Sequence, residues 1–261
     1  MNIKQDRYQT LDSDPSPRLP VCFLIDCSFS MQVVQGGTRT GERVARDGNI
    51  YDVVKGGSSP RITEVIRGFE GFINDILNDT RAKSSVEIAI VTFSNKVAIE
   101  RDFGPVDTGL KSLQFNAMGD GTRLGLAVKT GLQMLDRRKE DYSEYSISYY
   151  QPQLIILTDG EATDKEVCSE QARHVQQRMQ KGKLISLPFL IGDEKEAGAL
   201  RDFSPDQELL RIDGVNLVAL FRFLSQSAIQ QSRSTAGGNE SVNLKKMIAA
   251  LRQNIVPAGS I

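Results

Sequence analysis

Short apolar runs alternate with helix-like segments along most of the chain, and this alternation constrains the fold more than any other feature. The expected strands are the apolar runs Val21–Ile25, Val86–Phe93, Val97–Arg101, Leu154–Leu157, Leu184–Leu190 and Leu209–Ile212. The expected helices are Ile62–Leu77, Arg123–Leu135, Lys165–Gln180, Glu196–Asp202 and Leu217–Gln230. Strands that alternate with helices form a mainly parallel sheet, because each parallel connection needs a crossover. The connection Ser94–Lys96 is too short for one. The sequence therefore predicts an α/β, doubly wound (Rossmann-like) sheet of six strands with one antiparallel edge strand.

The length of 261 residues favours one domain with additions over two domains. We expect an N-terminal extension over 1–17, the α/β domain over 18–234 and a flexible tail over 235–261. In the tail, Leu244, Met247, Ile248 and Leu251 recur at the spacing of a short amphipathic helix. Inside the domain, residues 32–59 form an insertion. Its paired glycines and the turn signal Arg46–Asn49 indicate a β-hairpin or loop over Arg39–Val54, and a disordered insertion is an equal alternative.

The composition excludes some classes of partner. With 32 basic and 33 acidic residues the net charge is −1, so nothing indicates electrostatic capture of nucleic acid. The N-terminus leads to no apolar signal core, and no apolar run is long enough to cross a bilayer. The three cysteines are scattered and odd in number; Cys22 and Cys168 are interpreted as small apolar residues, and Cys27 as a spacer between polar residues. We therefore expect a cytoplasmic protein that binds neither nucleic acid nor a membrane.

Oxygen-bearing side chains stand where two of the expected strands end. Asp26, Ser28 and Ser30 follow the first apolar run, and Asp159 follows the run Leu154–Leu157. The glycine loop Gly119–Gly125 presents Thr122 just before a helix. Because ligands collect at the carboxyl ends of strands where the winding of a sheet reverses, we expect the two aspartates to lie together. Carboxylates and hydroxyls suit a hard dication such as Mg²⁺. For any one motif alone, helix N-capping is the favoured interpretation, but it does not explain all three motifs in this order.

The order of these three motifs resembles the metal-ion-dependent adhesion site of von Willebrand factor A domains. The resemblance implies Mg²⁺ or Mn²⁺ as the bound ion. It also implies that Ser28, Ser30 and Thr122 coordinate the ion largely directly. Asp26 and Asp159 would act directly or through water, and an Asp or Glu of a partner protein would complete the site.

The resemblance covers most of 18–234. The segments Arg18–Val21, Ser148–Asp164 and Leu220–Ser227 are similar to those of bacterial cytosolic A-domain proteins of the tellurium-resistance type. Membership of that group implies an adaptor or scaffold in a stress-response or defence system, with a phosphatase-like or kinase-like protein as partner. Only the metal motif is specific enough to carry residue roles.

The sequence departs from the family pattern at three places. Phe29 stands where the common bacterial version has glycine, and it is expected to shape the rim of the site. Asp120 stands where many relatives have glycine. Either it adds a carboxylate near the ion, or it caps the following helix, which is the favoured interpretation. The insertion over 32–59 separates the metal motif from the first helix, and we expect its hairpin or loop to lie beside the metal site.

Two function classes compete. The favoured hypothesis is a Mg²⁺-dependent, non-enzymatic binding module. The alternative is a metal-dependent phosphohydrolase with Asp26 as nucleophile, but that chemistry wants a second acid where Ser28 stands. A serine hydrolase lacks its Gly-x-Ser-x-Gly elbow, and no Walker-type phosphate loop is present.

Other polar side chains have structural interpretations. His174 lies on a polar helix and is expected to face solvent. Tyr142, Tyr145, Tyr149 and Tyr150 precede the strand that ends near Asp159, so they should lie at the opposite end of the sheet, as a structural strap or else a partner surface.

Overall fold

The computed structural model describes residues 11, 14–34, 37–46, 49–191, 198–205, 207, 210–212 and 217–233. Most of the predicted extension 1–17 and all of the predicted tail 235–261, with its helical stripe Leu244–Leu251, lie outside the described residues.

A six-stranded sheet forms the centre of the molecule, in the order β5-β4-β1-β6-β7-β8. The strands are β1 (Leu19–Asp26), β4 (Val86–Phe93), β5 (Val97–Pro105), β6 (Gln153–Thr158), β7 (Ile185–Ile191) and β8 (Leu210–Ile212). All neighbours are parallel except β4 and β5, which are antiparallel. The predicted fold class is confirmed. The winding reverses between β1 and β6, so their carboxyl ends lie where an α/β sheet gathers ligands.

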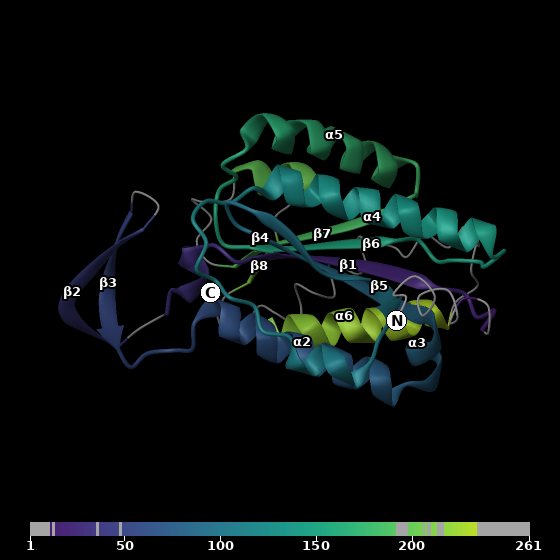
Figure 1. The fold of residues 1–261 in the computed structure, drawn as a ribbon, viewed down its shortest axis with the longest axis horizontal. Coiled ribbons are helices and arrows are strands. Elements are labelled where there is room, and N and C mark those ends of the chain that lie inside the picture. Colours follow the sequence, from purple (N-terminus) through teal and green to yellow (C-terminus); the bar gives the residue numbers. More distant parts are fainter. Residues whose placement is uncertain are drawn as a thin grey trace, which may run out of the picture.

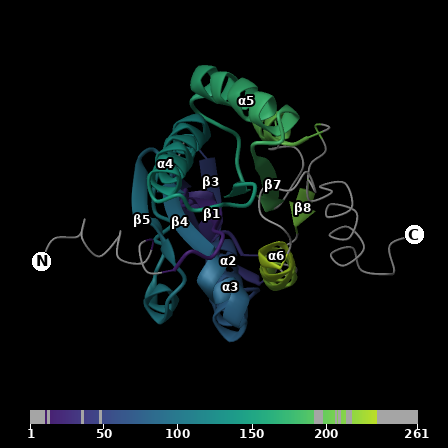
Figure 2. The same cartoon turned by 90° about the vertical axis from the view of Figure 1, so that its right-hand side faces the viewer.

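Helices cover both faces of the sheet (Figures 1 and 2). The helices on one face are α2 (Arg61–Asn78), α3 (Thr80–Ser85) and α6 (Leu217–Ser232); those on the other are α4 (Leu124–Glu144) and α5 (Lys165–Gln180). Three short 3-10 helices are η1 (Phe29–Gln32), η2 (Thr108–Ser112) and η4 (Gly198–Phe203). No helix in the described part of the chain is both long and apolar enough to cross a membrane.

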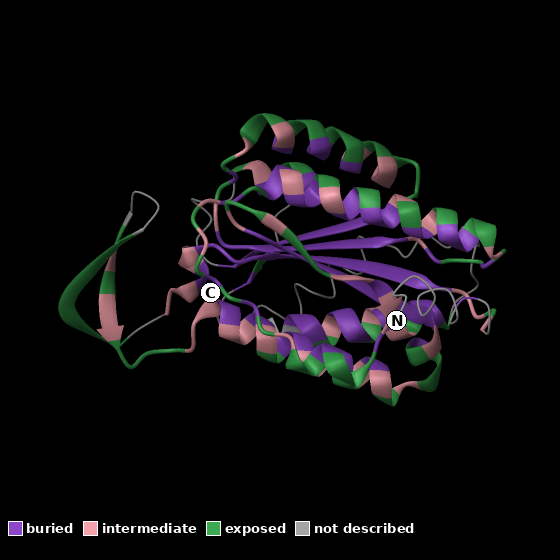
Figure 3. Cartoon of the chain, viewed as in Figure 1, coloured by how far each residue is buried: buried purple, intermediate pink, exposed green. Residues whose placement is uncertain are grey.

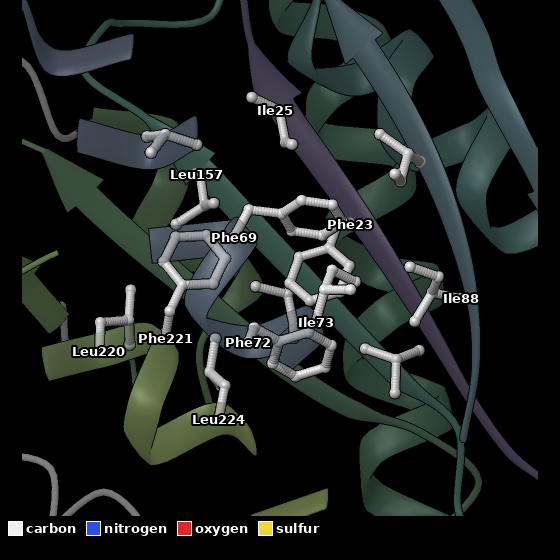
Figure 4. Packing of buried hydrophobic residues seen from close by; sticks show 14 of the residues in the cluster. Phe23, Ile25, Phe69, Phe72, Ile73, Ile88, Leu157, Leu220, Phe221 and Leu224 are labelled. Carbon is white, nitrogen blue, oxygen red and sulfur yellow. The ribbon is translucent and has the colours of Figure 1, made fainter. Parts of the chain in front are cut away.

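The two faces of the sheet explain its apolar strands. Every residue of β1, β4, β6 and β7 is buried, which is why these runs read as continuously apolar rather than alternating. Under α2 and α6, Phe23 of β1 meets Phe69 and Phe72 edge-on, with ring centroids 5.3 Å apart in each case (Figure 4). A Cβ at Gly68 of α2 would collide with the Phe221 ring of α6, so glycine is what allows these helices to approach.

Helix α4 is longer than predicted. The apolar stripe stops at Leu135, but the helix continues to Glu144 because polar residues take over its inner face. Arg138 is fully buried and binds both oxygens of Glu87 in β4, at 2.7 and 2.8 Å. Tyr142 donates to the same carboxylate at 2.6 Å. A search for apolar periodicity cannot recognise such a buried polar face.

The insertion is a β-hairpin, which is one of the interpretations that the sequence left open. Strands β2 (Thr38–Arg46) and β3 (Asn49–Lys55) pair with each other in a separate antiparallel sheet. The hairpin extends away from the body at the end where α2 begins, and its surface is largely exposed (Figures 1 and 3). Ile50 is 69% exposed, so the hairpin adds little to the core.

Other limits differ from the prediction. The helix expected at Glu196–Asp202 is the 3-10 helix η4, which begins at Gly198, and residues 192–197 lie outside the described residues. His174 is exposed on α5, as expected. Tyr150 is buried, and its hydroxyl donates to the Ser232 carbonyl at the end of α6 (3.0 Å), which supports the structural interpretation of the tyrosines.

Candidate metal centre

Asp26 is the last residue of β1 and is fully buried. Its Oδ1 accepts a hydrogen bond from the Ser28 amide (2.8 Å), and its Oδ2 accepts one from the Thr158 hydroxyl at the end of β6 (2.5 Å). The first bond folds the chain back over the strand end and holds Ser28 beside the Asp26 carboxylate. The second bond joins the two strand ends that the sequence placed together.

Asp159 follows β6 and is also fully buried. The Ser30 hydroxyl donates to its Oδ1 at 2.6 Å, and the Ser28 and Ser30 hydroxyl oxygens lie 3.0 Å apart. Because the single hydroxyl hydrogen of Ser30 goes to Asp159, Ser28 is the donor within the serine pair. Asp26, Ser28, Ser30 and Asp159 thus form one contiguous group of oxygen atoms, as predicted.

The glycine loop places Thr122 near this group. Gly119 pairs with Ser28 as an isolated parallel bridge, and its carbonyl accepts the Phe29 amide at 2.8 Å. The Thr122 hydroxyl lies 3.4 Å from the position that a Cβ would take on Gly160, the residue after Asp159. Thr122 is 6% exposed, and its carbonyl accepts the Thr163 amide at 2.9 Å. The loop therefore holds Thr122 beside the turn that carries Asp159.

Asp120 does not cap the following helix, contrary to the favoured expectation. The first free amides of α4, those of Gly125 and Leu126, are bound by Asp164, at 3.0 and 2.8 Å. Asp120 is exposed and lines a surface hollow of about 580 Å³ with Asn95 and Arg123. The sequence missed the role of Asp164 because 39 residues separate it from the helix that it caps.

Burial makes both carboxylates reluctant to ionise. For Asp26, burial and then the nearby charge of Asp159 raise the pKa from 3.8 to about 7. Burial also raises the pKa of Asp159, and the hydrogen bond from Ser30 and the charge of Arg61 offset part of this effect. Two buried carboxylates side by side hold charge at a cost unless a cation neutralises them.

Arg61 supplies one such positive charge, and the motifs of the sequence do not predict this role. Its Nη1 donates to Asp159 Oδ2 at 2.6 Å, and its side chain is 17% exposed. Arg61 is the first residue of α2, a short distance along the chain from the end of the hairpin at Lys55. An arginine at a helix start, where the macrodipole disfavours positive charge, is the one signal that could have marked it.

The side chains of the site fit a hard dication. In the part of the chain that the structure describes, no group of three or more His, Cys, Asp or Glu side chains is arranged to hold a metal ion. Hydroxyl and carboxylate oxygens are therefore the ligands on offer, and these suit Mg²⁺ or Mn²⁺. When both aspartates are ionised they carry one more negative charge than Arg61 balances, and a further cation would neutralise it.

The hairpin meets the site through Phe29. The Phe29 ring, between the two serines, lies edge-on to Tyr51 of β3, with ring centroids 5.3 Å apart. Phe29, one of the residues that differ from the family pattern, therefore contacts the inserted hairpin. This contact joins the hairpin to the rim of the site.

Comparison with family models gives one match. The model of the von Willebrand factor type A domain matches residues 57–215, which is more than half of the chain. The match includes Thr122 and Asp159. It begins after the hairpin, so Asp26, Ser28 and Ser30 fall outside it. Comparison with curated protein sequences finds no match.

Solved structures share the fold. The von Willebrand factor domain of the pilus tip protein Mfa5 from Porphyromonas gingivalis is similar over 85% of this chain and 98% of its own, with a TM-score of 0.56 and 13% identity. A type A protein from Catenulispora acidiphila is similar over 82% of this chain and 43% of its own, with a TM-score of 0.54 and 15% identity.

A third similar structure is proximal thread matrix protein 1 from the mussel byssus, whose metal-ion-dependent adhesion site is occupied by zinc. It matches over 83% of this chain and 47% of its own, with a TM-score of 0.52 and 14% identity. The chain thus spans less than half the length of the mussel and Catenulispora proteins.

Proposed function

The chain belongs to the von Willebrand factor type A domain family, and we propose that it is a protein-binding module whose site at Asp26 and Asp159 binds a divalent cation, Mg²⁺ or Mn²⁺. The observation that carries the proposal is the pair of fully buried carboxylates joined to two serine hydroxyls at the carboxyl ends of β1 and β6. The zinc-occupied site of the mussel protein supports a dication at the corresponding place.

Three hydroxyls and two carboxylates leave the bound ion with little surplus of negative charge. Ser28, Ser30 and Thr122 are neutral ligands, and Arg61 engages one oxygen of Asp159. The cation would therefore stay attractive to an outside anion. A carboxylate from an Asp or Glu of a partner protein is the ligand we propose. The hairpin, set against Phe29 at the rim, would then contact the same partner and tune which one is accepted.

We propose no enzymatic role. Asp26 has both oxygens engaged and no exposed surface, which disfavours it as the nucleophile of a phosphohydrolase. A phosphatase assay with Mg²⁺ and a generic phosphate ester tests this choice. Turnover that is abolished in Asp26→Asn would contradict the binding role.

The cellular setting is a further part of the proposal. A cytoplasmic adaptor in a bacterial stress-response or defence system of the tellurium-resistance type, with a phosphatase-like or kinase-like partner, agrees with the sequence resemblance. Cys22, Cys27 and Cys168 are buried and unpaired with one another, which suits a reducing compartment. Cell fractionation, and the tellurite sensitivity of a deletion strain, would test these points.

The test of the function itself is partner capture from the native cell, with Mg²⁺ against excess chelator at fixed salt. We expect the partner's affinity to fall when the metal is removed, and a Glu→Gln change at the partner's docking position to cost several kcal/mol, about 2–5. Equal affinity in Mg²⁺ and in chelator would place the interface elsewhere on the molecule.

A further inference from the structure

Arg61 binds the same carboxylate that a cation would use. Asp159 has two oxygens: Oδ1 accepts the Ser30 hydroxyl, and Oδ2 accepts Arg61 Nη1 at 2.6 Å. A guanidinium cannot lose its proton in a protein. A dication that enters beside Asp159 therefore meets a fixed positive charge already paired with its ligand.

The helix gains nothing from this arginine. Arg61 is the first residue of α2, where the helix macrodipole favours negative charge, and a guanidinium, which only donates hydrogen bonds, cannot satisfy the free amides there. The only ion pair that the structure gives this side chain in the described residues is the one with Asp159. Its placement is therefore explained by the site and not by the helix.

The Arg61 side chain can also move away from Asp159 toward solvent. Asp159 is fully buried, but the Arg61 side chain is 17% exposed, so part of it is in contact with solvent. It follows the hairpin, and its backbone amide is held by the Val33 carbonyl at 3.4 Å, so the side chain alone can move while the backbone stays in place.

We propose that Arg61 is a tethered competitor of the metal ion: it neutralises Asp159 in the metal-free protein, and cation binding must displace it. This inference rests on the proposed metal-binding function. A monovalent cation brings no more charge than the guanidinium that it would displace, whereas a dication brings one more. Arg61 thus lowers the affinity for every cation and restricts the site to dications.

The opposite role for Arg61 makes the opposite prediction. A residue that orients a metal ligand through a hydrogen bond raises metal affinity, and its loss typically costs about 10–100-fold. Removal of a competing charge instead tightens binding. The direction of the change therefore separates the two roles.

The experiment titrates Mn²⁺ alone into wild type, Arg61→Gln, Arg61→Lys and Arg67→Gln, with calorimetry for affinity and thermal unfolding of the metal-free forms. Arg67→Gln is the matched control: it removes the same charge from α2, but Arg67 is 58% exposed and pairs with Glu64 instead of the site. We expect Arg61→Gln to bind Mn²⁺ about tenfold more tightly or better. Its metal-free form should melt at a lower temperature, since Asp159 loses its partner.

Arg61→Lys keeps the charge, so its Mn²⁺ affinity should stay near that of wild type, and Arg67→Gln should leave both readouts nearly unchanged. Binding by Arg61→Gln where wild type shows none would also support the proposal. Equal or weaker binding in Arg61→Gln than in wild type would overturn it while leaving the metal function intact. If neither wild type nor Arg61→Gln binds Mn²⁺, both the proposed metal binding and the proposed competing role of Arg61 are wrong.

Discussion

The two ends of the central sheet bury carboxylates in opposite ways. At the amino end, the Glu87 carboxylate of β4 accepts two hydrogen bonds from Arg138 and one from the Tyr142 hydroxyl. It also lies 3.6 Å from the Arg18 side chain. At the carboxyl end, Asp26 and Asp159 stand together. At the amino end two arginines, Arg138 and Arg18, face one fully buried acid, Glu87, and they also pair with the more exposed Asp141 and Asp14. At the carboxyl end two fully buried acids share one arginine, Arg61.

The difference indicates which end is built for a ligand. A buried charge that is fully paired stabilises one arrangement and needs nothing from outside. A buried group that lacks one positive charge keeps protons at neutral pH or takes up a cation, as the raised pKa of Asp26 shows. We therefore assign a structural role to the end of the sheet at Glu87 and a ligand-binding role to the end at Asp26.

The largest effect is expected at the balanced end. Arg138→Met leaves Glu87 buried without its main partner, and removal of one member of a buried pair typically destabilises by about 3–5 kcal/mol. Urea unfolding of the metal-free protein measures this loss. The double variant Glu87→Gln, Arg138→Met removes both charges and should recover most of it. A single variant as stable as wild type would show that the cluster is not a structural pair.

The next effect is a pH dependence at the opposite end. Because the folded-state pKa of Asp26 is raised, to about 7, from an ordinary value of 3.8, the folded protein holds a proton that the unfolded chain releases. Its contribution to stability is complete below about pH 3.8 and is lost as pH rises through about 7. The melting temperature of the metal-free protein should therefore be lower at about pH 8 than at about pH 5.

Asp26→Asn is the control for the pH effect, because it keeps the shape and removes the titrating group. Its stability should change much less over the same range. A wild-type protein that becomes more stable on going from acid to neutral pH would contradict the assignment.

A smaller change is expected when metal ligands are shortened. The double variant Ser28→Ala, Thr122→Ala removes two hydroxyls from the site and should weaken metal binding by about 10–100-fold or more. Each lost hydroxyl should cost the metal-free fold only about 1 kcal/mol. Calorimetry gives the affinity, and Ser84→Ala, at the end of α3, serves as a control hydroxyl. Unchanged affinity would remove Ser28 and Thr122 from the ligand set.

The smallest effect on stability is expected at the hairpin. Replacing residues 37–56 with a short Gly/Ser link removes an exposed two-stranded sheet and the Phe29–Tyr51 contact. The loss should stay at about 1 kcal/mol, since aromatic pairs contribute roughly 0.5–1.5 kcal/mol and surface loops cost little entropy. Metal affinity should persist while partner affinity falls. A large drop in melting temperature would make the hairpin part of the core.

The sequence predicted what depends on local pattern. Asp26 and Asp159 were found because each follows an apolar run, and strand ends of a doubly wound sheet meet at one edge. Arg61, Arg138 and Asp164 were not found as partners, because their contacts depend on tertiary register. Arg61 meets an acid 98 residues away, and Arg138 meets one 51 residues away.

Buried polar faces were the other blind spot. The predicted helix ends at Leu135 because the inner face of α4 then changes from apolar residues to Arg138 and Tyr142. Helical spacing continues through these residues, but hydrophobic periodicity does not register it. The capping role given to Asp120 failed for a related reason: Asp164, from a distant turn, already holds the first amides of α4.

The most direct test compares how variants at the two ends of the sheet bind a cation. Mg²⁺ is titrated by calorimetry at about pH 8, above the raised pKa of Asp26, into wild type, the carboxyl-end variant Asp26→Asn, Asp159→Asn and the amino-end variant Glu87→Gln, Arg138→Met. We predict one bound ion in wild type and in the amino-end variant, and none in the carboxyl-end variant. Binding that survives the loss of both Asp26 and Asp159 would contradict the account.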